Sequence, residues 1–103
     1  MNIPFWGKGL EFISIYGDSM YPKFCAGEVI GIKRLEPEYL VYGHAYVVIF
    51  KNGDVHLKYI KKGKSENHII LESENKFYEP REFHLNKIKS IYQIKGVLSK
   101  VQM

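Results

Sequence analysis

A serine at a sharp bend is the first residue of this sequence whose position could support chemistry. Ser19 follows Gly17 and Asp18 at the end of an apolar, strand-like run, residues 11–16. Glycine frees the backbone to turn, and aspartate can hydrogen-bond its own main chain there. A strand that delivers a serine to such a bend leaves its hydroxyl exposed and its amide free, as nucleophilic catalysis requires. A serine in a Gly-Asp turn is also an ordinary turn residue, so this pattern alone leaves both interpretations open.

Lys58 is the basic residue best placed to activate such a serine. It lies in the strand-like run 55–60, on the same face as His56 and Ile60. A lysine with its ordinary pKa near 10.4 is protonated at neutral pH, but burial disfavours the ammonium and lowers that pKa. A neutral lysine can then take the serine proton, which is the Ser–Lys variant of nucleophilic catalysis. From its type alone, Lys58 is equally an ordinary strand lysine with its amine in water. Four other lysines are expected to be solvated, because they lie beside an arginine or in a basic turn: Lys33, Lys61, Lys62 and Lys64.

The longer pattern around these residues is more specific. Gly17-Asp18-Ser19-Met20-x-Pro22 is followed by Gly-Glu at 27–28, by the lysine-bearing strand 54–58, and by Glu-Asn-x-x-Tyr-x-Pro within 71–80. In this order the pattern resembles the LexA/UmuD-like self-cleaving serine peptidases over most of the chain, roughly residues 11–101.

The resemblance implies a role for each matching residue. Ser19 would be the nucleophile and Lys58 the general base, and the amide of Ser19 would help to hold the oxyanion. Four neighbours would support the site: Gly17, Asp18, Met20 and Pro22. The segment 71–80 is interpreted as a structural turn that supplies no catalytic group.

The sequence departs from the family pattern in three places. Residues 27–28 read Gly-Glu where the family usually has Gly-Asp, a change that keeps the charge. The family cuts itself between a small residue and glycine upstream of the serine, whereas the upstream pairs here are Trp-Gly at 6–7 and Lys-Gly at 8–9. The helix-turn-helix domain that is usual in the repressors has no counterpart in the 103 residues.

Two functions therefore stay open. The first is a Ser–Lys endopeptidase domain of a transcriptional or prophage-type regulator, which cuts its own N-terminal region or a partner polypeptide. The second is a dimerisation module of a DNA-binding repressor in which the dyad is idle. The resemblance implies a homodimer, a RecA-type filament as a further partner, and DNA contact only through an N-terminal domain absent here. A signal-peptidase relative is disfavoured, because those enzymes carry a membrane anchor.

The hydrophobic pattern predicts an all-β domain of antiparallel hairpins, and the resemblance implies the same compact, strongly bent fold. No stretch keeps a helical period. Residues 1–10 are interpreted as an N-terminal arm or linker remnant before a single domain, 11–103, with a short helical turn at 20–24 and loops at 39–43 and 73–81. Asn52-Gly53 is the strongest turn signal and predicts a tight hairpin. Strands are predicted over 11–16, 28–35, 45–50, 55–60, 67–72 and 91–101.

Composition excludes several other classes. The net charge of +4 arises from 15 bases mixed with 11 acids, which does not indicate a nucleic-acid domain. Cys25 is the only cysteine and suits the reducing cytoplasm, where we expect this protein. Residues 1–10 do not read as a signal peptide, and the apolar run 45–50 is too short to cross a bilayer. We expect no cofactor and no metal, because the histidines lack the short spacing of zinc motifs: His44, His56, His68 and His84.

Overall fold

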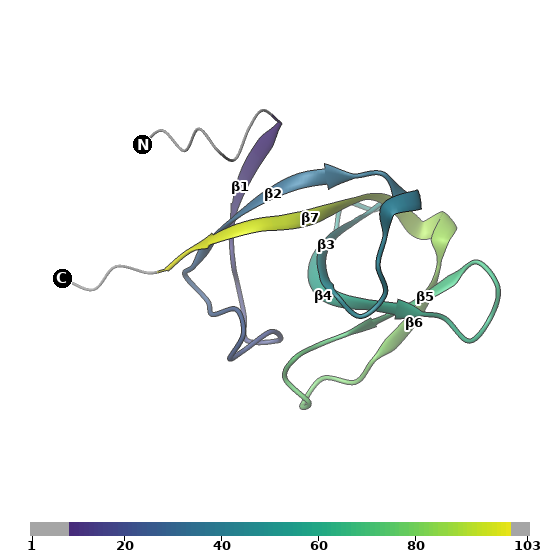
Figure 1. Ribbon diagram of the computed structural model, residues 1–103. Helices are drawn as coiled ribbons and strands as arrows, with labels where there is room; N and C mark the ends of the chain where they lie inside the picture. The colour runs from purple at the N-terminus through teal and green to yellow at the C-terminus, as the bar shows by residue number, and fades with distance from the viewer. Residues whose placement is uncertain (1–8, 100–103) are drawn as a thin grey trace.

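The computed structural model describes residues 9–99, and in that range it is all-β, as the sequence predicted. The described part contains strands and two single-turn 3₁₀ helices, and none of its helices is long and apolar enough to cross a membrane. In chain order the elements are β1 (Leu10–Ser14), β2 (Val29–Leu35), η2 (Pro37–Tyr39), β3 (Ala45–Phe50), β4 (Val55–Lys62), β5 (His68–Glu72), β6 (Arg81–His84), η3 (Leu85–Lys87) and β7 (Ile88–Leu98) (Figure 1).

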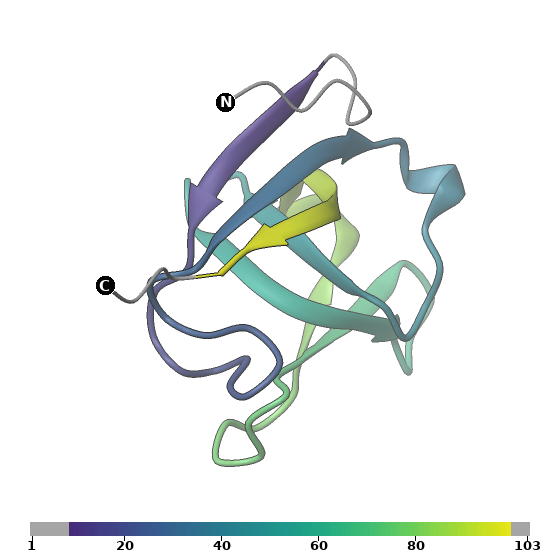
Figure 2. The same cartoon turned by 60° about the vertical axis from the view of Figure 1, so that its left-hand side comes forward.

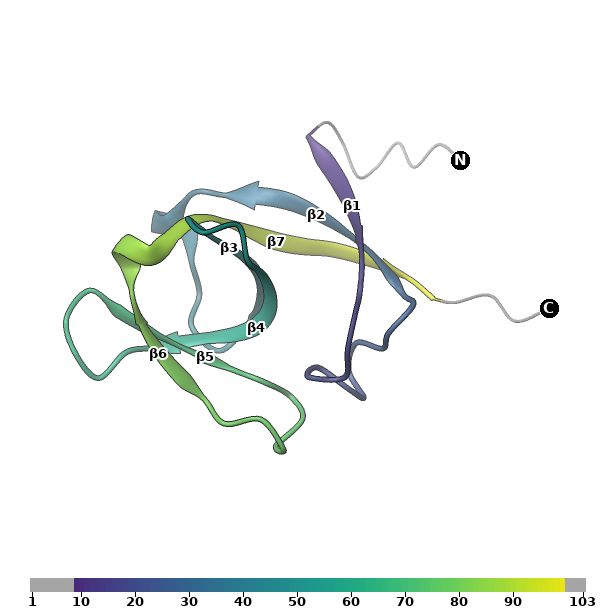
Figure 3. The same cartoon turned by 180° about the vertical axis from the view of Figure 1, so that it is seen from behind.

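The seven strands form one antiparallel sheet in the order β1-β2-β7-β3-β4-β5-β6. The last strand of the described residues, β7, lies between β2 and β3 and so joins the first two strands to the other four. Register shifts at Gly31/Ile32 and Ile49/Phe50 mark bulges, which bend a sheet and increase its twist. The sheet consequently curls, so that β5 and β6 lie across from β2 and β7 rather than beside them (Figures 1 and 3).

The predicted hairpin at Asn52-Gly53 is confirmed. Strands β3 and β4 pair from Ala45↔Tyr59 to Ile49↔Val55. Gly53 has a φ of 97°, a conformation that glycine adopts without steric cost. The side chain of Asn52 accepts a hydrogen bond from the Asp54 amide at 2.9 Å, which closes the turn locally. This hairpin sets the register of β4 and therefore decides which of its side chains face each side of the sheet.

Strand β3 is buried on both faces, as its continuous apolar run predicted. Val47 and Val48 are both fully buried, and they belong to two different hydrophobic clusters. One cluster fills the inside of the curled sheet: Tyr46, Val48, Phe50, Ile60, Ile69, Leu71 and Ile91. The other lies on the opposite face: Ile15, Met20, Phe24, Ile30, Ile32 and Val47. Met20 and Phe24 come from the segment that joins β1 to β2, so this second cluster anchors that segment against the sheet.

Several predicted boundaries differ from the structure. The segment 20–24 is a turn closed by one hydrogen bond, Phe24 N to Met20 O at 2.8 Å, and not a helix. Strand β4 continues through Lys61 and Lys62, which were predicted to form a turn, because β5 pairs with both of them. Strand β6 was not predicted, and β7 begins three residues earlier than expected. Strand β1 already includes Leu10, which had been placed in the arm, and Gly9 precedes it in a turn. Residues 1–8 of the predicted arm and residues 100–101 of the last predicted strand lie outside the described residues.

The turn between β4 and β5 leaves no room for a side chain at Gly63. Its amide donates to the carbonyl of His68 at 3.0 Å, and a Cβ at this position would lie 2.4 Å from that same oxygen. We expect Gly63→Ala to lower the free energy of unfolding by about 1–3 kcal/mol, because the backbone must move to relieve the overlap. Urea denaturation measures this change.

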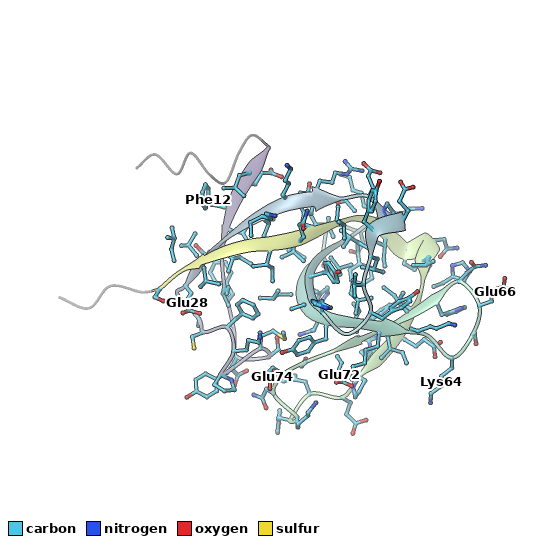
Figure 4. All side chains as sticks on the ribbon, viewed as in Figure 1. Phe12, Glu28, Lys64, Glu66, Glu72 and Glu74 are labelled. Atoms are coloured by element: carbon cyan, nitrogen blue, oxygen red, sulfur yellow. The ribbon has the colours of Figure 1, made fainter. Side chains whose placement is uncertain are left out.

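Lys64→Ala is the matched control, because Lys64 lies at the same turn with an exposed side chain (Figure 4). Its free energy of unfolding should stay within about 0.5 kcal/mol of that of the unsubstituted protein. Equal urea midpoints for the two variants would contradict the packing argument at Gly63.

Candidate active site

Ser19 and Lys58 meet, although 39 residues separate them in the chain. Lys58 Nζ donates a hydrogen bond to Ser19 Oγ at 2.7 Å, and the contact is partly buried. Ser19 comes from the connection between β1 and β2, whereas Lys58 lies in the middle of β4, opposite Tyr46 of β3. The distance falls within the 2.6–3.2 Å expected for a nucleophile and its base. The structure therefore brings together the two residues that the sequence singled out.

The backbone around Ser19 is shaped by a few local contacts. The amide of Ile15 donates to Glu28 O at 2.9 Å, and the carbonyl of Ile15 accepts from Gly27 N at 3.0 Å. These two hydrogen bonds hold the two ends of the β1–β2 connection together. Gly17 has a φ of 75°, a conformation that glycine adopts without steric clash because it has no Cβ, and the chain turns there. Met20, which is 2% exposed, then inserts into the hydrophobic cluster. Ser19 thus lies between the turn at Gly17 and the buried side chain of Met20.

The surroundings of Lys58 favour its neutral form. Burial lowers the pKa of Lys58 from its ordinary value, because an ammonium loses hydration in this position. Within the described residues no carboxylate lies within ion-pair distance of its amine. The carboxylate of Asp18 accepts instead from Tyr78 Oη at 2.6 Å, and that of Asp54 from the Asn52 side chain at 3.2 Å. Both aspartates thus have other partners, as the dyad would require.

Tyr78, a neighbour of Lys58 in the described part of the chain, favours the protonated form of the lysine instead. Its ring centroid lies 6.0 Å from Lys58 Nζ, an arrangement that attracts an ammonium. That distance is at the outer limit of cation–π attraction, which is worth roughly 0.5–1 kcal/mol at exposed sites. Desolvation is therefore the larger effect on the pKa of Lys58.

A cleft of about 480 Å³ opens beside the pair. One wall is the end of β1 with the following connection, and the other is the first half of β4, residues 55–58. Its floor is apolar, with side chains from Ile15, Met20, Ile30 and Leu57. Strand β4 pairs with β3 along 55–59 but with β5 only from Tyr59 onward, so in the described chain the second edge of 55–58 has no partner strand. Hydrogen-bonding backbone and apolar surface therefore flank the serine together.

A second loop, residues 73–80 between β5 and β6, lies against the Ser19 segment. The two connections run side by side at the lower edge of Figure 2, and Glu74 is labelled where they meet in Figure 4. Asn75 donates from its amide to Ser19 O at 2.9 Å and from its side chain to Asp18 O at 3.1 Å. Tyr78 reaches the side chain of Asp18, and this hydrogen bond raises the pKa of the Tyr78 phenol.

The sequence had assigned this loop only a structural turn. The polar residues of the Glu-Asn-x-x-Tyr-x-Pro pattern are the signal that could have revealed its contacts, because Asn75 and Tyr78 are two of its fixed positions. The contacts themselves join residues up to 60 positions apart, and no local pattern encodes such a pairing.

The four residues that were expected to support the site make different contacts in the structure. Gly17 forms the turn, Asp18 binds the 73–80 loop, and Met20 anchors the segment while its sulfur accepts from the Glu74 amide at 3.3 Å. Pro22 lies in the following turn, where its carbonyl accepts from the Cys25 thiol at 3.6 Å. In the described part of the chain, histidine, cysteine and acidic side chains form no group of three that could hold a metal ion.

An all-β domain that presents a serine hydroxyl and a desolvated lysine amine beside an apolar cleft has the parts of a serine peptidase. A family model described as Peptidase S24-like matches residues 7–97. The chain therefore belongs to the Peptidase S24-like family, the family of the LexA/UmuD-type domains, which confirms the resemblance found in the sequence. A search of curated proteins returned no match to this chain.

Proposed function

We propose that this domain is a Ser–Lys endopeptidase of a transcriptional or prophage-type regulator, and that it cuts an extended segment of its own chain or of a partner chain. The observation that carries the proposal is the 2.7 Å contact between Ser19 Oγ and the amine of Lys58. The lowered pKa of Lys58 and its lack of a carboxylate partner among the described residues give that contact the chemistry of a base.

In the proposed reaction, neutral Lys58 accepts the hydroxyl proton of Ser19 as the Oγ–carbon bond to the scissile carbonyl forms. The carbonyl oxygen becomes an oxyanion, to which the amide of Ser19 would donate a hydrogen bond. Lys58 then returns the proton to the departing nitrogen as the peptide bond breaks, which leaves an ester on Ser19. Water, deprotonated by Lys58, hydrolyses this ester and restores the serine.

The cleft favours an extended peptide as the substrate. A segment laid along residues 55–58 would find the unpaired backbone edge of β4, and strand addition of this kind uses main-chain hydrogen bonds for affinity. Alternate side chains of such a segment would point at the apolar floor around Ile15, Met20 and Ile30. The scissile carbonyl of the bound segment would then lie next to Ser19 at the end of the cleft.

The second candidate function is a dimerisation module whose dyad is idle. The end of β7 favours it, because Val97 and Leu98 are each more than 40% accessible there and form exposed apolar surface on which a second copy could pack. In this case the site would keep its geometry but Ser19 would not react.

Covalent labelling of Ser19 separates the two functions. We expect an alkyl fluorophosphonate to add one phosphonyl group per chain, located on Ser19 by peptide mass spectrometry, because the dyad activates this hydroxyl. Ser19→Ala should take up none. The unsubstituted protein, incubated with a mixture of extended peptides, should cut some of them, whereas Ser19→Ala should cut none.

Ser65→Ala is the control, since it removes an exposed serine in the β4–β5 turn and should leave the labelling unchanged. An unsubstituted protein that takes up no label and cuts no peptide would contradict the peptidase proposal and favour the dimerisation module.

A further inference from the structure

Asn75 holds two successive peptide groups of the Ser19 segment. Its side-chain Nδ2 donates to the carbonyl of Asp18 at 3.1 Å, and its backbone amide donates to the carbonyl of Ser19 at 2.9 Å. The remaining polar atom of its side chain, Oδ1, accepts from the Phe77 amide at 3.0 Å. One residue of the 73–80 loop therefore binds the carbonyls on both sides of Ser19 Cα, and the Tyr21 amide also donates to the Asp18 carbonyl, at 3.1 Å.

Fixing these carbonyls also fixes two amides. In a trans peptide the C=O and the following N–H point in opposite directions. The bonds on either side of Ser19 are both trans, since the described chain has its one cis peptide at Tyr21–Pro22. With both carbonyls turned toward Asn75, the amides of Ser19 and Met20 point away from the 73–80 loop. Neither amide donates to any group of the described residues.

We propose that Asn75 is a positioning residue that aims the Ser19 and Met20 amides as the donor pair for the oxyanion. The inference rests on the proposed peptidase function and adds to it the residue that orients the hydrogen-bond donors for the oxyanion. Asn75 acts through the two peptide groups that it holds and not by contact with the substrate. A donor pair fixed in advance stabilises developing charge without reorganising during the reaction.

The loop that carries Asn75 is itself held on two sides. Tyr59 Oη donates to the carboxylate of Glu74 at 2.5 Å, and burial together with this hydrogen bond raises the pKa of Tyr59 to about 12. On the other side, Tyr78 Oη donates to the carboxylate of Asp18 at 2.6 Å. Asn75 lies between these contacts, so the loop cannot shift away from Ser19 without breaking one of them.

Labelling by an alkyl fluorophosphonate tests the inference. In this reaction the Ser19 Oγ–P bond forms, the P–F bond breaks, fluoride leaves and the hydroxyl proton passes to Lys58. Negative charge develops on the phosphoryl oxygen, where the two amides would stabilise it. Asn75→Asp keeps the size of the side chain and its Oδ1 acceptor, but it removes the Nδ2 donor and sets a carboxylate oxygen against the Asp18 carbonyl.

We expect the labelling rate of Asn75→Asp to fall about 10²-fold, the lower end of the effect of losing an oxyanion donor. Two readouts should stay constant: the pH midpoint of the reaction, because Lys58 is untouched, and the final stoichiometry of one label per chain. A merely structural role would lower the stoichiometry, because part of the protein would be unfolded. Asn75→Ala, which keeps the backbone donor and adds no charge, should show a smaller loss of rate.

Asn86→Asp is the matched control. Asn86 is an exposed asparagine of η3, where its backbone amide donates to His84 Nδ1 at 3.0 Å, a contact that the substitution keeps. This variant should label at the rate of the unsubstituted protein.

Three results would overturn the inference. The first is an unchanged rate in Asn75→Asp. The second is a slower rate together with a shifted pH midpoint, which would mean that Asn75 acts through Lys58. The third is a fall in stoichiometry in both Asn75 variants. If Ser19 of the unsubstituted protein does not react at all, the proposed function fails and this inference fails with it.

Discussion

Lys58→Met should lower the rate at which an alkyl fluorophosphonate labels Ser19 by about 10³-fold, within the range that a general base supplies. The methionine side chain is similar in length to that of lysine, so it fills the partly buried site of Lys58. It has no basic nitrogen and therefore cannot accept the serine proton. The charged form of Lys58 is already disfavoured there, so the substitution should not reduce the free energy of unfolding. The measurements are the labelling rate and the urea midpoint of the same preparation.

Lys62→Met is the control, because Lys62 lies four residues further along the same strand with an exposed side chain. It should label at the rate of the unsubstituted protein. If Lys58→Met reacts as fast as Lys62→Met, Lys58 is not the base, whatever its distance from Ser19.

The second large effect is the dependence of labelling on pH. Only neutral Lys58 can accept the proton, and its pKa is lowered by burial. The rate should therefore rise about tenfold per pH unit below that pKa and level off above it. The midpoint should lie below the ordinary pKa of a lysine. Rates measured at constant ionic strength across the neutral and alkaline range give this midpoint.

His56 is another titrating side chain of β4, and it lies two residues before Lys58 and so on the same face of the strand. Burial, and then repulsion by Lys58, lowers the pKa of His56 from its ordinary 6.5. His56 is consequently neutral over the alkaline range, and His56→Gln should leave the alkaline midpoint in place. A midpoint at the ordinary lysine value, or one that moves in His56→Gln, would contradict the assignment to Lys58.

The sequence predicted those parts of the fold that depend on local signals. The two apolar faces of β3 follow from an uninterrupted run of apolar residues, and the hairpin follows from Asn52-Gly53. The side of the sheet on which Lys58 lies follows from strict alternation along β4. The position of Ser19 follows from a turn, and its pairing with Lys58 was implied by the family resemblance, which the family match confirms at the level of the family.

The parts that the sequence missed depend on tertiary pairing. Lys61 and Lys62 belong to β4 because β5 pairs with them, and the carboxylate of Glu72 lies 3.0 Å from the Lys61 amine. Residues 81–84 form β6 because their backbone pairs with β5, although their sequence has no clear alternation. The two hydrogen bonds from Asn75 to the Ser19 segment likewise join distant positions, so no window of neighbouring residues predicts them.

The central place of β7 has a consequence for how this protein is made. The segment with Ser19 belongs to the β1–β2 end of the sheet and Lys58 belongs to the β3–β6 part, and β7 is the strand that joins the two. A ribosome synthesises residues 88–98 only after both of those parts, so a growing chain carries serine and lysine before it has the strand that brings them into one sheet. The hydroxyl of Ser19 should therefore stay unreactive in a nascent polypeptide until β7 has left the exit tunnel.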